Sequence, residues 1–255
     1  MRLRLCVLIA LAPLLAAPAS ALDPALYSRL LERHTRAVDD LVGTRVDYPA
    51  LARSADWKRL VASLDGADPA ALHTRDQKLA FWINVYNVLA LDVVARNWPV
   101  ESIRDVGSLF SPVWKRPAGR VGGRSVSLDE VEHEIVRPLG DPRAHAAVVC
   151  ASTSCPSLRR EPYAAERLDA QLDDAMQTWL ASEGKGLRVD RAANTVWLSK
   201  IFDWFAEDFE AAGGARAFAT RYAPESEQTW LRSNGNSARV RFLDYDWDVN
   251  ALNSR

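Results

Sequence analysis

The segment from His145 to Pro156 holds the densest group of residues that could do chemistry. Its apolar run up to Cys150 predicts a buried strand, and residues 151–162 predict a turn-rich loop. In an extended strand His145 and Cys150 would point to opposite faces, so they could not form a nucleophile–base pair. Cys155 would lie on the loop, where a thiol can be exposed and activated as a nucleophile by a histidine from elsewhere in the fold.

The two cysteines leave three alternatives open. They could form a disulfide if the loop between them brings their Cα atoms to roughly 4.4–6.8 Å. Cys150 could instead be a small core residue, or one thiol could be reactive. A zinc site that uses both cysteines and His145 is less favoured, because the sequence contains no tight ligand doublet. We therefore predict no metal and no cofactor.

A helix predicted from Ser127 to about Pro138 places a carboxylate among apolar side chains. Ser127 is expected to cap it, with Glu130 as the partner in a capping box. At about 100° per residue, Glu132 falls inside the apolar stripe and His133 falls outside it. A carboxylate on a core face is costly unless it is paired. Glu132 could pair with an arginine, Arg137 or Arg143, or it could orient or accept a proton in a site.

Two amides lie on the most apolar helix of the chain. Thr74 and Gln77 form a capping-box pattern at its start, and the helix is predicted to run to about Asn97, before Pro99. Its apolar residues cover every side, which predicts a central buried helix. Asn84 and Asn87 could bond loop backbone, the commoner arrangement, or one could line a cleft and hold a substrate or a catalytic histidine.

The first 21 residues have the pattern of a cleavable signal peptide: arginines at the start, a short apolar run, and a small-residue close at Ala19-Ser20-Ala21. The apolar run is shorter than a membrane span requires, which favours cleavage over a retained anchor. We therefore predict export, with a periplasmic or secreted location and no stable membrane insertion after cleavage.

The mature chain of residues 22–255 would carry 30 basic and 33 acidic residues without a basic tail or block. This balance argues against nucleic acid as a partner. With no low-complexity linker and no repeat, one domain is expected. Further helices are predicted at 24–41, 50–64, 165–180, 199–211 and 215–222, strands at 46–48, 187–189, 195–198 and 240–245, and a loop-like region at 99–126. We predict an α+β fold: a central buried helix packed against short antiparallel strands and surrounded by further helices.

Five stretches of the chain resemble the domain of unknown function 547 family. They are Phe81-Trp82-Ile83-Asn84-Val85-Tyr86-Asn87, the helix from Ser127 to Arg137, the segment His145–Leu158, the stretch Leu198–Phe205, and Tyr245-Asp246-Trp247-Asp248-Val249-Asn250. Val46-Asp47-Tyr48 is also similar to the family's opening. The resemblance implies an exported or otherwise soluble domain, with no settled activity. Candidate residues on these stretches include Asn84, Asn87, Glu132, His145, Cys150 and Cys155.

Two functional hypotheses follow. The first is a thiol-dependent hydrolase or transferase for a peptide, amide or thioester, with Cys155 as nucleophile, His145 before His133 as base, and Glu132 or Asn84 as the orienting group. The second is a non-enzymatic envelope binding or accessory domain, in which a Cys150–Cys155 disulfide is a clip and some of the nine tryptophans line a ligand groove. The ligand would be a small molecule or a peptide.

Overall fold

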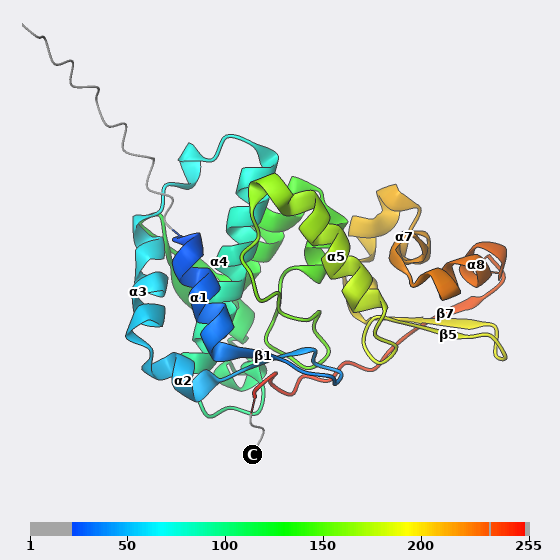
Figure 1. Cartoon of the computed structure of the whole chain (residues 1–255), viewed down its shortest axis with the longest axis horizontal. Helices are drawn as coiled ribbons and strands as arrows, with labels where there is room; N and C mark the ends of the chain where they lie inside the picture. Colours follow the sequence, from blue (N-terminus) through cyan, green and yellow to red (C-terminus); the bar gives the residue numbers. More distant parts are fainter. Residues whose placement is uncertain (1–21, 235, 253–255) are drawn as a thin grey trace, which may run out of the picture.

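The computed structural model describes residues 22–234 and 236–252 (Figure 1). The predicted signal peptide, residues 1–21, lies outside the described residues. The α-helices are α1 Pro24–His34, α2 Tyr48–Arg53, α3 Ala55–Ser63, α4 Arg75–Arg96, α5 Leu168–Leu180, α6 Ile201–Trp204, α7 Ala215–Tyr222 and α8 Glu225–Asn234. The strands are β1 Thr35–Ala37, β2 Thr44–Val46, β3 Pro117–Val121, β4 Arg124–Ser127, β5 Leu187–Asp190, β6 Thr195–Leu198 and β7 Arg239–Phe242.

Short helical turns connect these elements. Most are 3₁₀ turns: η1 Leu64–Gly66, η2 Pro69–Ala71, η3 Ile103–Val106, η4 Val113–Lys115, η6 Arg137–Leu139, η7 Pro142–Ala146, η8 Ala165–Arg167 and η9 Ala206–Ala212. One, η5 Glu130–Val136, is a π-helix. The mixture of helices with small, separate sheets confirms the predicted α+β class.

Helix α4 is the central buried helix. The predicted capping box is present: Thr74 accepts from the Gln77 amide at 3.1 Å, and Gln77 accepts from the Thr74 amide at 3.0 Å. The helix is capped at Asn97, as its sequence predicts. Within the described residues α4 is also the one helix long and apolar enough to cross a membrane by composition, but most of it is buried inside this domain.

Three sheets surround the helices. β1 pairs with β2 and β3 with β4, each antiparallel, while β5, β6 and β7 form one sheet. The predicted hairpin of β5 and β6 is confirmed. β7 pairs with β6 in parallel, so the third sheet is mixed. A parallel partner needs a long crossover, and α6, α7 and the unpredicted α8 supply it.

Several segments differ from the prediction. The strand expected at 46–48 ends at Val46, the helix expected at 50–64 is divided into α2 and α3, and the helix expected at 199–211 is α6 followed by the 3₁₀ turn η9. The helix expected at 24–41 ends at His34, where the chain enters β1 and the Thr35 hydroxyl caps the Leu31 carbonyl at 2.6 Å. The region 99–126, expected to be loop-like, contains the β3–β4 hairpin. Gly122 and Gly123 have φ of +59° and +78°, which is the conformation that a two-residue hairpin turn requires. A Gly-Gly pair between two short segments with apolar residues therefore predicts a β-hairpin as well as a loop.

The buried apolar side chains form two clusters. One surrounds α4 and includes α1 to α3 and β2 to β4, and the other lies among α5, α6, α7, β5 and β6. After β7 the C-terminal segment runs back across the molecule towards β1 (Figure 1). Its backbone bridges Ser102, Ser152 and Val46 in turn. This return places the side chains that follow β7 beside the segment of the two cysteines.

Candidate functional site

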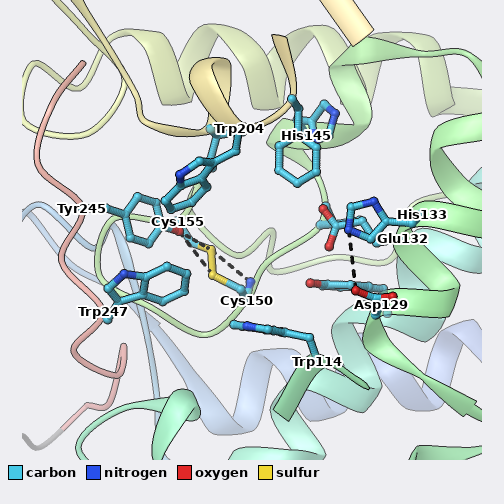
Figure 2. A pocket seen from close by; sticks show the side chains of 14 residues that line it. Trp114, Asp129, Glu132, His133, His145, Cys150, Cys155, Trp204, Tyr245 and Trp247 are labelled. Carbon is cyan, nitrogen blue, oxygen red and sulfur yellow. Dashed lines mark hydrogen bonds and ion pairs between the residues drawn. A yellow bond between two sulfur atoms is a disulfide. The ribbon is translucent and has the colours of Figure 1, made fainter. Parts of the chain in front are cut away.

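A cavity of about 320 Å³ lies where the two apolar clusters meet. Its residues come from α4, η4, η5, η7, the cysteine segment, α6 and the C-terminal segment. One wall is aromatic and contains Trp114, Trp204, Tyr245 and Trp247, whereas Phe205 packs against the two histidines of the other wall. The facing wall carries Asp129, Glu132, His133 and His145. Figure 2 shows the sulfurs of Cys150 and Cys155 between these two walls. Junctions between clusters are frequent ligand sites.

The polar wall begins on η5. Ser127 accepts from the Glu130 amide at 3.0 Å, as predicted, but the Glu130 carboxylate pairs with Arg124 instead of completing the capping box, and the following turns are π-helical. A π-helix bonds i to i+5 and turns less per residue than an α-helix. The burial agrees with the projection at 100° per residue, since Glu132 is half-buried and His133 is exposed, but both side chains also line the cavity. π-helical turns are frequent at functional sites.

Within the described residues Glu132 has no ion pair with an arginine, contrary to one of its two predicted alternatives. Its carboxylate interacts with the hydroxyl of Tyr86 on α4. Burial raises the pKa of Tyr86 well above its ordinary value, and the charge of Glu132 raises it further. Tyr86 is therefore a protonated donor to Glu132. Arg143, one of the expected partners, instead binds Asp141, Asp169 and Asp173.

Arg137, the other expected partner, organises both histidines. It donates to His133 Nδ1 at 2.7 Å, and because arginine is always protonated, that nitrogen must be an acceptor. The other ring nitrogen of His133, Nε2, lies 3.9 Å from Asp129 Oδ1. Arg137 also donates to Asp208 at 2.7 and 2.9 Å. Asp208 in turn accepts from His145 Nε2 at 2.7 Å.

His145 is held rigidly. Its ring is 4 % exposed and lies 4.3 Å from the ring of Phe205. Burial opposes ionisation of Asp208, but hydrogen bonds from His145 and Arg137 outweigh it and hold the pKa of Asp208 well below its usual range. The His145–Asp208 pair thus resembles the base–orienter pair of nucleophilic enzymes, although Asp208 was not among the predicted site residues.

Residues 146–150 do not form the predicted strand. η7 covers Pro142–Ala146, and the chain then continues without regular structure to Cys150. The argument that His145 and Cys150 point to opposite faces was therefore wrong, and both line the cavity. The apolar run has the composition of a strand, but Asn87 of α4 bonds its backbone and takes the place of a neighbouring strand.

Cys150 and Cys155 form a disulfide, with their Cα atoms 6.3 Å apart. Ala151 follows Cys150 with φ of +62°, an uncommon conformation that often marks functional sites. Cys155 is 3 % exposed, so the expectation of an exposed Cys155 thiol on a loop was wrong. Cys150 is the more accessible of the two.

Polar hydrogens surround the sulfurs. The Cys150 amide donates to Cys155 Sγ at 3.0 Å. The Tyr245 hydroxyl lies 3.3 Å from each sulfur, and the Ser152 hydroxyl lies 2.9 Å from Cys150 Sγ. Burial raises the pKa of Tyr245, so its hydroxyl keeps its proton. Neither sulfur, in the described part of the chain, has a hydrogen bond with a histidine.

Asn84 and Asn87 are buried but do not line the cavity. Asn84 donates to the Tyr163 carbonyl at 2.8 Å and accepts from the Tyr163 amide at 2.9 Å. Asn87 makes the same double contact with the Ala147 carbonyl, at 2.9 Å, and the Val149 amide, at 2.8 Å. Both amides therefore follow the backbone-bonding alternative, and Asn87 positions the backbone directly before Cys150.

A comparison with protein families finds that residues 70–180 match the family described as "Protein of unknown function, DUF547". Residues 70–180 therefore form a DUF547 domain. Comparisons with curated proteins and with solved structures find no match. The DUF547 match contains Tyr86, the acids and histidines of the polar wall, and both cysteines.

Most of the aromatic wall lies outside the DUF547 match, on residues 204–247. The rings of Trp204 and Trp247 stack with their centroids 5.6 Å apart. The ring of Tyr245 packs against both, with its centroid 4.8 Å from that of Trp204 and 4.5 Å from that of Trp247. Two hydrogen bonds fix the C-terminal segment. The Ser154 amide donates to the Asp246 carbonyl, and the Ser154 hydroxyl accepts from the Asp246 amide. The sequence contained a signal for these residues, since Leu198–Phe205 and Tyr245–Asn250 are among the stretches that resemble the family.

No cluster of three or more His, Cys, Asp or Glu side chains arranged as metal ligands is present in the described ranges 22–234 and 236–252. The polar wall and the disulfide offer acid–base, hydrogen-bonding and sulfur chemistry.

Proposed function

We propose that the DUF547 domain binds a small thiol or disulfide in its cavity and exchanges it with the Cys150–Cys155 pair. One observation carries the proposal: the disulfide borders a cavity and has two polar hydrogens directed at its sulfurs. A disulfide that serves as a clip needs neither a cavity nor donors of this kind. The proposal is a redox form of the predicted thiol-dependent enzyme.

The exchange begins when a substrate thiolate attacks Cys150 Sγ, the more accessible sulfur. A bond forms between the substrate sulfur and Cys150, the Cys150–Cys155 bond breaks, and its electron pair leaves on Cys155 Sγ. A second substrate thiolate then attacks the substrate sulfur of the mixed disulfide and releases Cys150. Two substrate thiols thereby become one disulfide, and the protein keeps the two electrons as a dithiol. The reverse sequence reduces a bound disulfide.

The surroundings of Cys155 favour it as the leaving group. Its sulfur accepts from the Cys150 amide, and the protonated Tyr245 hydroxyl lies within hydrogen-bond distance. Both contacts stabilise a thiolate, and a better-stabilised thiolate leaves faster.

The geometry favours exchange over the thiol hydrolase. A cysteine hydrolase needs a base within hydrogen-bond reach of its sulfur. Within the described residues neither His145, which bonds Asp208, nor His133, which bonds Arg137, has a hydrogen bond with Cys150 or Cys155. Export by the predicted signal peptide would place the domain in the periplasm or outside the cell, where disulfides persist, and this location forms part of the proposal.

The test compares two single-cysteine variants of residues 22–255. Cys155→Ser leaves Cys150 as a thiol and Cys150→Ser leaves Cys155. Each is mixed with the neutral disulfide bis(2-hydroxyethyl) disulfide, and mass spectrometry follows the mixed disulfide. We expect Cys155→Ser to react at least tenfold faster, because Cys150 faces the cavity, and the two variants to react alike in urea. If both folded variants are inert and react only in urea, the pair is a clip and the domain is a binding domain.

Tyr245→Phe in the oxidised wild-type background sharpens the test. Removal of the hydroxyl is expected to slow attack by 2-mercaptoethanol several-fold, because the Cys155 thiolate loses one of its donors. Tyr222→Phe is the matched control, since Tyr222 interacts with Asp173 and does not line this cavity. Equal rates in the two variants would contradict the assigned role of Tyr245.

A further inference from the structure

The cavity carries negative charge that the protein does not neutralise. Its lining contains Asp129 and Glu132, and it contains no lysine and no arginine. The Nδ1 of His133 lies 2.7 Å from Arg137 and its Nε2 lies 3.9 Å from Asp129. Glu132 has Tyr86 as a partner, and among the described residues Asp129 has this contact with His133 as its one ion pair. Each carboxylate accepts up to about four hydrogen bonds, so both have unused capacity towards the cavity.

The arginines behind this wall are already engaged. Arg137 binds Asp208 and Glu207, and Arg143 binds three aspartates. Within the described residues, no lysine or arginine forms an ion pair with Asp129 or Glu132. Two carboxylates in a partly enclosed cavity repel each other and favour a bound cation. The compensating charge must therefore come from the ligand.

The opposite wall suits the same kind of ligand. Trp114, Trp204, Tyr245 and Trp247 present aromatic rings, which attract cations through their faces and pack against hydrocarbon. One of these rings already binds a cation outside the cavity: the guanidinium of Arg104 lies 5.1 Å from the centroid of Trp247. Figure 2 shows Trp204, Tyr245 and Trp247 on one side of the disulfide and the two acids on the other, with Trp114 below, beside Asp129.

We infer that the substrate is an aminothiol or its disulfide, a compound with a cationic amine a few bonds away from its sulfur. The amine binds between the two carboxylates and the aromatic rings, and the sulfur meets Cys150. This inference rests on the proposed exchange, and it adds the charge of the substrate. The exchange steps are unchanged. An aminothiol attacks Cys150 and Cys155 leaves as a thiolate. In the reverse direction Cys150 bonds one sulfur of the substrate disulfide, and the other half of that disulfide leaves as a thiolate.

The experiment uses three disulfides of similar size and different charge on Cys155→Ser. They are cystamine, a dication, bis(2-hydroxyethyl) disulfide, which is neutral, and 3,3′-dithiodipropionate, a dianion. Each rate is divided by the rate of the same reagent with the urea-unfolded variant, which removes intrinsic reactivity. We expect cystamine to exceed the neutral compound at least tenfold and the dianion to be slowest. Equal ratios for the three reagents would overturn the inference.

Substitutions of the acids identify the source of the preference. Glu132→Gln and Asp129→Asn, each combined with Cys155→Ser, are expected to reduce the ratio of cystamine to the neutral compound several-fold. Any effect on Cys150 itself cancels in this ratio. Glu130→Gln is the matched control, because Glu130 is on the same π-helix but binds Arg124 and does not line the cavity. A preference that survives both acid substitutions would contradict the assignment.

A sulfur-free probe separates this inference from the proposed function. The oxidised wild-type protein is titrated with 2-phenylethylamine and with neutral 2-phenylethanol, and tryptophan fluorescence or calorimetry follows binding. Tighter binding of the amine without disulfide exchange would support cation recognition and overturn the exchange function. Disulfide exchange without any preference for amines would support the exchange function and overturn the inference of an aminothiol substrate. If neither exchange nor amine binding is observed, the proposed function and the inference are both overturned.

Discussion

Two groups of polar side chains differ in their partners, one buried on α4 and one at the cavity. In the first, Asn84 and Asn87 are buried and have both ends of each amide bonded to backbone. In the second, Asp129 and Glu132 border a cavity and lack an arginine or lysine partner in the described part of the chain. The first group stabilises the fold, and the second can bind a ligand. Both groups can be found in the sequence as polar residues among apolar ones. What distinguishes them is whether their hydrogen-bonding atoms are already paired within the protein.

Lys185 extends the first group. Its side chain is buried and its Nζ donates to the Val42 carbonyl at 2.9 Å and lies 3.2 Å from the Ser157 hydroxyl. Burial lowers its pKa to about 8. It borders none of the cavities near the candidate site. We therefore interpret it as a structural lysine, whose burial costs free energy at neutral pH.

The largest expected effect is on the first group. Asn87→Ala leaves the Ala147 carbonyl and the Val149 amide without their partner, and each unpaired buried group costs roughly 1–3 kcal/mol. We expect the free energy of unfolding to fall by about 4 kcal/mol, measured by urea denaturation. Asn97→Ala is the control, since Asn97 bonds only the Val93 carbonyl in a partly buried position, and a loss below about 1.5 kcal/mol is expected. Equal losses of unfolding free energy in the two variants would show that the two backbone hydrogen bonds of Asn87 contribute no more to stability than the single bond of Asn97.

A smaller effect concerns pH. Because the folded pKa of Lys185 lies below its ordinary value of 10.5, the unfolded chain binds more protons between these two values, and stability rises with pH there. The difference in free energy of unfolding between wild type and Lys185→Met should shift in favour of wild type by about 1.5 kcal/mol from pH 8 to 9.5. Urea denaturation of both proteins across this range measures it. A difference independent of pH would mean that Lys185 titrates at its ordinary value.

The smallest effect is expected in the second group. Glu132→Gln removes a charge that has no cationic partner in the described residues and keeps an acceptor for Tyr86. The free energy of unfolding should therefore change by no more than about 0.5 kcal/mol. Thermal and urea denaturation at pH 7 check this. A loss above about 2 kcal/mol would place Glu132 with the structural amides and remove the distinction between the two groups.

Local signals in the sequence were sufficient for several elements. The capping box at Thr74, the apolar composition of α4 and the turn at Asn194 predict structures that depend on neighbouring residues, and all three are confirmed. The prediction failed where a tertiary contact replaces a local one. Residues 146–150 have strand composition, yet Asn87 of α4 satisfies their backbone. At Glu130–Val136 the predicted helix is a π-helix, and Glu132 and His133 both line the cavity.

The sequence by itself determined the α+β class, the central helix, the DUF547 resemblance and most of the polar and sulfur residues of the site. The tertiary structure alone decided which of them meet: Asp208 joins His145 across 63 positions, and Tyr245 reaches both sulfurs from 90 or more positions away. The physical reason is range. Caps and periodicity act over a few residues, whereas a cavity forms where two apolar clusters and a returning C-terminal segment pack together.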